Sequence, residues 1–258
     1  MKEFYGSEIE TVDYKTDAEG ARNKINSWVE ERTNDRIQNL IPEGLLNPLT
    51  RLVLANAIYF KGNWAHQFNP GTTRPAPFTR LDGTTIDVPM MSQTGTFKLA
   101  HSEEFKALEL PYEGGDLSMI VLLSNKSGTL PSIDHETLDT LEFNERRLMV
   151  QLPKFKLESS FQLGDTLAAM GMPLAFSNQA DFSRMTGTRD LSIGAVVHKA
   201  FVEVNEEGTE AAAATAVMMR SKSMPPQFIA NHPFLFIIRE NSTGTILFIG
   251  RVMDPSHA

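Results

Sequence analysis

The segment that decides the fold is VEVNEEGTEAAAATAVMMRSKSMPPQF, residues 202–228. It begins with the alternation of a β-strand, runs through Gly208 and four consecutive alanines, and ends at Pro225-Pro226. Composition alone favours a short exposed helix or loop here, because alanine has the highest helix propensity. A strand is the alternative, since alternate positions hold only small uncharged residues, namely Thr209, Ala211, Ala213 and Thr215. A segment this long without apolar anchors is usually functional or disordered.

The second half of this segment carries two basic residues, each followed by serine: Arg220-Ser221 and Lys222-Ser223. A trypsin-like protease cleaves after a basic residue on an accessible chain. The pattern therefore predicts a loop that serves as bait for such a protease.

Composition excludes several classes of function. The chain has 258 residues, a net charge of -8 and no cysteine. Its acidic balance argues against nucleic-acid binding, and no apolar run is long enough to span a membrane. The six histidines form no i, i+4 pair, and there is no Walker-type glycine loop and no G-x-S-x-G motif. We therefore expect no enzyme, no metal site and no cofactor.

The remaining pattern predicts an α+β fold with many strands, few helices and no linker that would divide it into domains. Residues 16–31 form an amphipathic helix with a Thr16–Glu19 capping box. Residues 51–60 are apolar at every second position on both faces, which is typical of a strand inside a sheet. Further strands are expected at 105–124 and 232–253, each a hairpin, and at 148–160 and 194–207; short helices are expected at 133–141 and 161–172.

Several segments resemble the serpin family, in the family's order and over essentially all 258 residues. They are LANAIYFKGNW (54–64), VPMM (88–91), LPKF (152–155), HKAFVEVNEEGTEA (198–211), FIANHPFLFII (228–238) and FIGRVMDP (248–255). The resemblance implies one serpin domain over 1–258, with a large central β-sheet A, two smaller sheets and packed helices. An exposed reactive-centre loop is then expected at about 206–226.

The resemblance also implies a function, that of a suicide inhibitor of serine proteases. The protease attacks the reactive bond, and the cleaved loop inserts into the large sheet between the strands at 51–60 and 194–207 before the acyl-enzyme can hydrolyse. In family terms the bond follows the residue fourteen positions after Gly208, which is Lys222, so it is Lys222-Ser223, with Arg220-Ser221 as the rival. A monomer that forms a covalent complex with a trypsin-like protease is expected.

Other residues take their expected roles from the same resemblance. Asn56 and His198 correspond to the polar shutter beneath the sheet, Trp64 to the breach where insertion begins, and Lys154 to the partner of Glu206. The hinge that inserts first comprises Glu206, Glu207, Gly208, Thr209, Glu210, Ala211, Ala212, Ala213, Ala214 and Thr215. The ordinary alternative for each residue is core packing or a solvated ion pair.

The match covers the C-terminal two-thirds of the family fold, so an N-terminally incomplete serpin is expected. We expect these 258 residues alone to be aggregation-prone and a poor inhibitor, because apolar faces would be uncovered. The resemblance favours an extracellular location, although MKEFYGSEIE (1–10) lacks the apolar segment of a signal peptide. A non-inhibitory serpin with a carrier, chaperone or storage role, an inactive truncated paralogue, and a plain interaction module remain alternatives.

Overall fold

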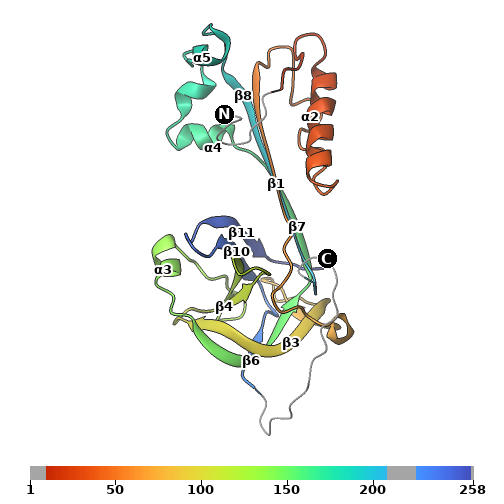
Figure 1. The fold of residues 1–258 in the computed structure, drawn as a ribbon, viewed down its shortest axis with the longest axis vertical. Helices are drawn as coiled ribbons and strands as arrows, with labels where there is room; N and C mark the ends of the chain where they lie inside the picture. Colours follow the sequence, from red (N-terminus) through yellow and green to blue (C-terminus); the bar gives the residue numbers. More distant parts are fainter. Residues whose placement is uncertain (1–9, 208–224, 257–258) are drawn as a thin grey trace. The chain divides into compact units, whose positions relative to one another are not determined.

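The computed structural model describes residues 10–207 and 225–256. Their contacts divide the chain into two compact units (Figure 1). The first holds the described residues up to Tyr59 together with Glu158–Phe201, and the second holds Phe60–Leu157 and the described residues from Val202 onward. Mixed helices and strands confirm the α+β class.

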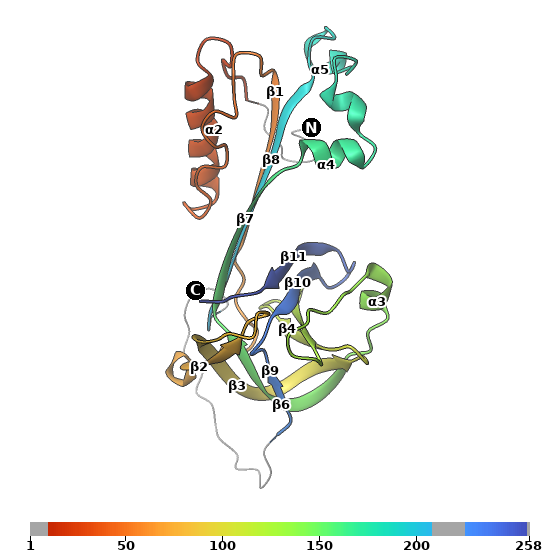
Figure 2. The ribbon, with the colours of Figure 1, turned by 180° about the vertical axis from the view of Figure 1, so that it is seen from behind.

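The first unit packs one long helix on a small sheet. Helix α2 (Ala18–Arg32) lies beside β1 (Leu52–Phe60) and β8 (Ile193–Val204), as Figure 2 shows, and β7 (Phe155–Gln162) completes the order β1-β8-β7. Three short helices follow β7: α4 (Gly164–Ala169), η2 (Pro173–Phe176) and α5 (Ser183–Thr186). The helix–sheet core contains Val29, Ile37, Leu40, Ile41, Leu46, Val197 and Phe201.

Two sequence predictions about this unit need correction. The N-cap of α2 is Asp17, whose carboxylate accepts from Gly20 N, because the Thr16 hydroxyl donates to Asp13 instead. Strand β1 forms as predicted, but it stands at one end of the described three-strand order and its residues are half-buried or exposed. Within the described residues it is therefore not a strand with two buried faces.

The second unit is built on an eight-stranded sheet. Seven of its strands follow the order β11-β10-β5-β4-β3-β6-β9, and β2 (Arg74–Thr79) pairs with β3 outside this order. The bounds of the seven strands, in the same order, are Ile246–Val252, Phe234–Glu240, Leu117–Ser124, Phe105–Pro111, Thr85–His101, Asn144–Pro153 and Gln227–Ile229. The 3-10 turn η1 (Pro70–Thr72) precedes β2. All pairs with a described register are antiparallel except β6 with β9.

Both predicted hairpins of this unit are confirmed. Residues 113–116 turn with Gly114 and Gly115 at φ of 88° and 77°, a region that favours glycine. The predicted strand at 148–160 is wrong as one element: the chain breaks at Lys154, whose N–H donates to Pro89 O, and continues into a different sheet as β7. The long strand β3 was missed.

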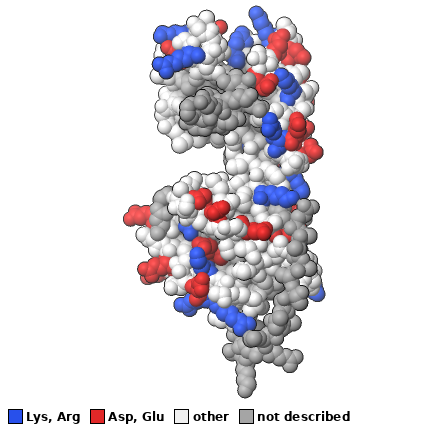
Figure 3. All heavy atoms as spheres, viewed as in Figure 1, with Lys and Arg blue, Asp and Glu red and all other residues white. Residues whose placement is uncertain are grey.

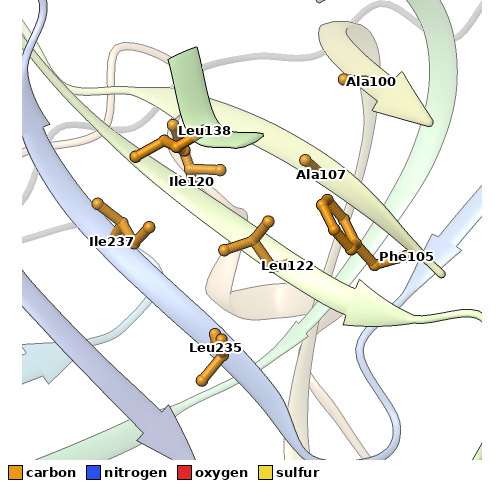
Figure 4. Close-up of a cluster of buried hydrophobic side chains, with 8 residues drawn as sticks. All are labelled: Ala100, Phe105, Ala107, Ile120, Leu122, Leu138, Leu235 and Ile237. Atoms are coloured by element: carbon orange, nitrogen blue, oxygen red, sulfur yellow. The ribbon is translucent and has the colours of Figure 1, made fainter. Parts of the chain in front are cut away.

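Helix α3 (His135–Asp139) covers one face of this sheet. Its Leu138 packs on Ile120, Leu122, Leu235 and Ile237, with Phe105, Ala107 and Ala100 beside them (Figure 4). On the opposite face Phe155 lies 5.8 Å from Phe234 and 5.4 Å from Phe236, ring centre to ring centre. Both faces of the central strands are therefore buried.

An ion cluster lies at the end of the α3-covered face. The carboxylate of Glu109 is 8% exposed and bonds Arg239 Nη2 at 3.1 Å and Lys98 Nζ at 3.0 Å. The Arg239 guanidinium also lies 5.9 Å from the ring centre of Phe143. Three strands, β3, β4 and β10, are thus joined through one carboxylate.

No helix among the described residues combines the length and the hydrophobicity that a membrane crossing requires.

Candidate functional site

The predicted reactive loop leaves β8 and returns at β9. Gly208 to Thr215, Arg220, Ser221, Lys222 and Ser223 lie outside the described residues. The described residues nearest to them are Asn205 to Glu207 before the loop and Pro225 to Ile229 after it. The geometry of these two ends can be built from their contacts.

Trp64 holds the start of the loop. Its backbone N–H donates to Glu207 O at 3.1 Å, and its indole Nε1 donates to Asn205 O at 3.0 Å. Phe68 N adds a bond of 2.8 Å to Glu206 O. Three consecutive carbonyl groups after β8 are thereby fixed by one short segment of chain.

Aromatic packing fixes Trp64 itself. The indole is 4% exposed and stacks on Tyr112 with ring centres 4.6 Å apart and an angle of 12°. Phe60 meets Tyr112 edge to face at 4.8 Å. Burial raises the pKa of the Tyr112 phenol, so the stack remains neutral at any physiological pH.

Glu206 is a buried carboxylate beside this cluster. Its Oε2 accepts from Lys154 Nζ at 2.9 Å, and its Oε1 accepts from the Thr73 hydroxyl at 2.8 Å. Burial acts to raise the pKa of Glu206, but the hydrogen bonds from Lys154 and Thr73 outweigh it, and the pKa lies below its usual value of 4.5. The structure brings Glu206 and Lys154 together, and it adds Thr73, which sequence reasoning missed.

Replacing Glu206 with glutamine is expected to lower the free energy of unfolding by about 1–2 kcal/mol at pH 7, since the pair is only partly buried. The folded pKa is depressed, so the carboxylate stabilises the protein above its unfolded pKa and loses this effect as pH falls from about 4.5 downward. Denaturant titrations of both proteins at pH 7 and pH 3 measure the difference. A gap of equal size at both pH values would contradict this account.

The end of the loop is held by β6. Met149 N donates to Pro226 O at 2.9 Å, and Ala230 N donates to Gln151 O at 2.9 Å. Between these bonds β9 runs parallel to β6, with Met149 opposite Gln227. The segment that follows the loop therefore enters the sheet in a fixed register.

Asn56 and His198 meet in the first unit. His198 Nδ1 lies 2.7 Å from Asn56 Oδ1, and the imidazole stacks with Phe161 at 6.2 Å and 22°. Their strands β1 and β8 are hydrogen-bonded neighbours. These are the two strands between which the sequence resemblance expects insertion.

A third polar group in this unit was missed by sequence reasoning. The Lys199 side chain is 11% exposed, and its Nζ reaches Glu158 Oε1 on β7 at 2.5 Å and donates to Gln38 O at 2.7 Å. Lys199 alternates along β8 with Val197 and Phe201, and all three residues are buried. Sequence spacing could not reveal Gln38, which lies 161 residues away.

The described site contains hydrogen-bonded anchors and ion pairs. Among the described residues no group of three or more His, Cys, Asp or Glu side chains is placed to hold a metal ion. In the second unit these contacts fix the described residues on either side of 208–224, and in the first unit a polar contact joins β1 and β8.

Comparison with known proteins agrees with this arrangement. The family model described as "Serpin (serine protease inhibitor)" matches residues 1–255. The chain belongs to the serpin family, which is a family of protease inhibitors and not of enzymes.

Among its relatives, the chain is 47% identical to "Serpin B3" of Homo sapiens over 99% of this chain and 69% of that protein. It is 42% identical to "Leukocyte elastase inhibitor" of Bos taurus over 98% of this chain and 72% of that protein. The solved structure of uncleaved ovalbumin is similar with a TM-score of 0.89 and 36% identity, covering 98% of this chain and 71% of ovalbumin. The serpin fold predicted from the sequence is confirmed.

Proposed function

We propose that the protein inhibits trypsin-like serine proteases through a reactive bond at Lys222-Ser223. The observation that carries the proposal is a sequence with two basic residues, each followed by serine, between two chain ends that hydrogen bonds hold in place. Trp64 holds the first end through Asn205 and Glu207, and β6 holds the second through Pro226. Family membership supplies the inhibitory precedent, since its relatives include a leukocyte elastase inhibitor.

The chemistry is that of an interrupted proteolysis. The serine oxygen of the protease adds to the carbonyl carbon of Lys222 and forms an ester, while the amine of Ser223 leaves with the proton that the protease's own base supplies. Deacylation by water would release a cleaved loop. In the proposal, insertion of the loop as a strand between β1 and β8 distorts the protease before water attacks.

The described residues would each have a part in this insertion. Trp64 and the Glu206–Lys154 pair would hold the hinge where insertion starts. The Asn56–His198 contact joins the two strands that must separate, so it would exchange partners as the sheet opens. The small side chains at alternate positions, Thr209, Ala211, Ala213 and Thr215, would then enter the sheet without burying an unpaired charge.

Mixing the intact gene product with trypsin tests the proposal. We expect a complex of both proteins that survives boiling in SDS, and a released peptide that begins at Ser223. Cleavage without a complex would indicate a non-inhibitory serpin or an inactive paralogue. An uncleaved chain that still binds the protease would indicate a plain interaction module. A peptide that begins at Ser221 would move the bond to Arg220.

A change in the hinge tests insertion separately from cleavage. Thr209→Arg would place a cation with no evident partner at the first inward position of the inserting strand, which costs several kcal/mol unless the charge is paired. Insertion should slow relative to deacylation, so the variant should be cut at the same bond and form little stable complex. The fraction of trypsin trapped per molecule cleaved measures this. Thr209→Ser is the matched control, and full trapping by Thr209→Arg would argue against insertion.

A further inference from the structure

We propose that Arg146 and Arg147, at the start of β6, form a second docking surface for the target protease and select proteases with acidic residues beside the active site. The inference rests on the proposed function and deepens it by naming a property of the partner. It follows from where β6 stands in the chain and from the charges on it.

Chain length places a bound protease next to β6. Pro226 O is bonded to Met149 N on this strand, and Ser223 stands three positions before Pro226 in the sequence. A chain extends by at most about 3.6 Å per residue, so the reactive bond lies within roughly 11 Å of Pro226. A trypsin-sized domain of about 240 residues has a radius of gyration near 18 Å. A protease engaged at this bond would therefore lie close to the start of β6.

The start of β6 is accessible on both faces. Residues 144–147 are all exposed, whereas Leu148, Val150 and Leu152 are buried. Consecutive strand residues point to opposite faces, so Arg146 and Arg147 project on either side of the strand. Figure 3 shows lysine and arginine atoms along the lower edge of this unit, with aspartate and glutamate atoms beside them.

The two arginines lack the carboxylate partner that several other arginines of the chain have. Arg22, Arg80, Arg189 and Arg239 each pair with a carboxylate. In the part of the chain that the structure describes, neither Arg146 nor Arg147 has an ion pair, and their cross-strand partners are Phe97 and Thr96. Exposed charges without a local partner act over the distance of a docking protein.

Neighbouring residues add to the positive potential. Burial lowers the pKa of His101, and the charges of Lys106 and Arg146 lower it further, which shows that these two cations act on the same place. Glu145 precedes Arg146 in β6 and stands opposite Lys98 in β3. Lys98 already pairs with Glu109 at 3.0 Å, so the cations of this region that have no carboxylate partner among the described residues are Arg146, Arg147 and Lys106.

Charge complementarity of this kind raises association rates by about 10–1,000-fold and depends on salt. The double variant Arg146→Glu/Arg147→Glu should react with trypsin at least about tenfold more slowly than the parent at 0.05 M salt. At 1 M salt, where the screening length is about 3 Å, the difference should disappear. A trypsin whose exposed carboxylates beside the active site are replaced by lysine should reverse the order and prefer the variant.

Two controls separate this inference from the proposed function. Lys15→Glu/Arg184→Glu makes the same change in net charge at exposed residues of the other unit and should leave the rate unchanged. The parent, the double arginine variant and the control variant could all form the complex at the same rate at low salt. That result would overturn the docking surface and leave the proposed function intact. If the parent traps no protease, the proposed function fails. In that case, the equilibrium affinity for a trypsin whose catalytic serine is replaced by alanine is measured for the parent and for the double arginine variant. Equal affinities of the two proteins would overturn the docking surface.

Discussion

Replacing Lys222 with glutamate is expected to slow the trapping of trypsin by at least about a thousandfold, since like charges that meet in a desolvated pocket cost several kcal/mol. A trypsin-like enzyme selects its cleavage site by pairing a buried carboxylate with the basic side chain. Glutamate at this position would bring a second carboxylate into that pocket. The second-order rate constant for formation of the SDS-stable complex measures the effect.

Arg220→Glu is the matched variant for this experiment. It makes the same change of charge two residues earlier and should leave the trapping rate within a fewfold of the parent. The opposite result, with Arg220→Glu inactive and Lys222→Glu unchanged, would assign the reactive bond to Arg220-Ser221. Both variants leave the described ends of the loop at Glu207 and Pro225 untouched.

Removing the Glu109 carboxylate should have the largest effect on stability. Glu109→Ala would leave the mostly buried Arg239 guanidinium, 19% exposed, without its partner, and breaking such a pair costs about 3–5 kcal/mol. The β3–β4–β10 connection through Glu109 would be lost as well. Urea unfolding at pH 7, followed by circular dichroism, measures the loss of free energy.

Two further variants separate the contributions of Lys98 and Arg239 to this loss of stability. Lys98→Met should cost less than about 1 kcal/mol, because the Lys98 side chain is 53% exposed and its pairing is largely screened. The double variant Glu109→Leu/Arg239→Leu removes both buried charges and should recover much of the stability lost in Glu109→Ala. A double variant less stable than Glu109→Ala would contradict the electrostatic explanation.

Local sequence patterns predicted most of the helices and strands, but they did not predict which sheet each part of the chain joins. The hairpin at 113–116 was readable because two glycines mark the turn between apolar strands. The division of 148–160 between two sheets was not, because Lys154 interrupts no periodicity and its bond to Pro89 is long-range. The helix cap was misassigned because the Thr16–Glu19 pattern does not reveal that the Thr16 hydroxyl bonds Asp13, which leaves Asp17 to cap the helix.

The residues of the candidate site were likewise predicted only in part from the sequence. Trp64, Glu206, Lys154, Asn56 and His198 could be named because family motifs contain them. Thr73 lies 133 residues from Glu206 and Gln38 lies 161 from Lys199, and no spacing rule relates such pairs. Contacts of this kind exist only once the chain has folded, so a single sequence carries no signal for them.

The two tryptophans give the protein one optical reporter in each unit. Trp28 in the first unit is 37% exposed, whereas Trp64 in the second is 4% exposed and stacked on Tyr112. Trp64 also bonds Asn205 O, at the point where the chain leaves β8 for the loop. A movement of Asn205 would change the surroundings of this indole. The fluorescence emission of Trp64 in a Trp28→Phe protein would therefore report movement at the start of the loop in real time, without an added dye.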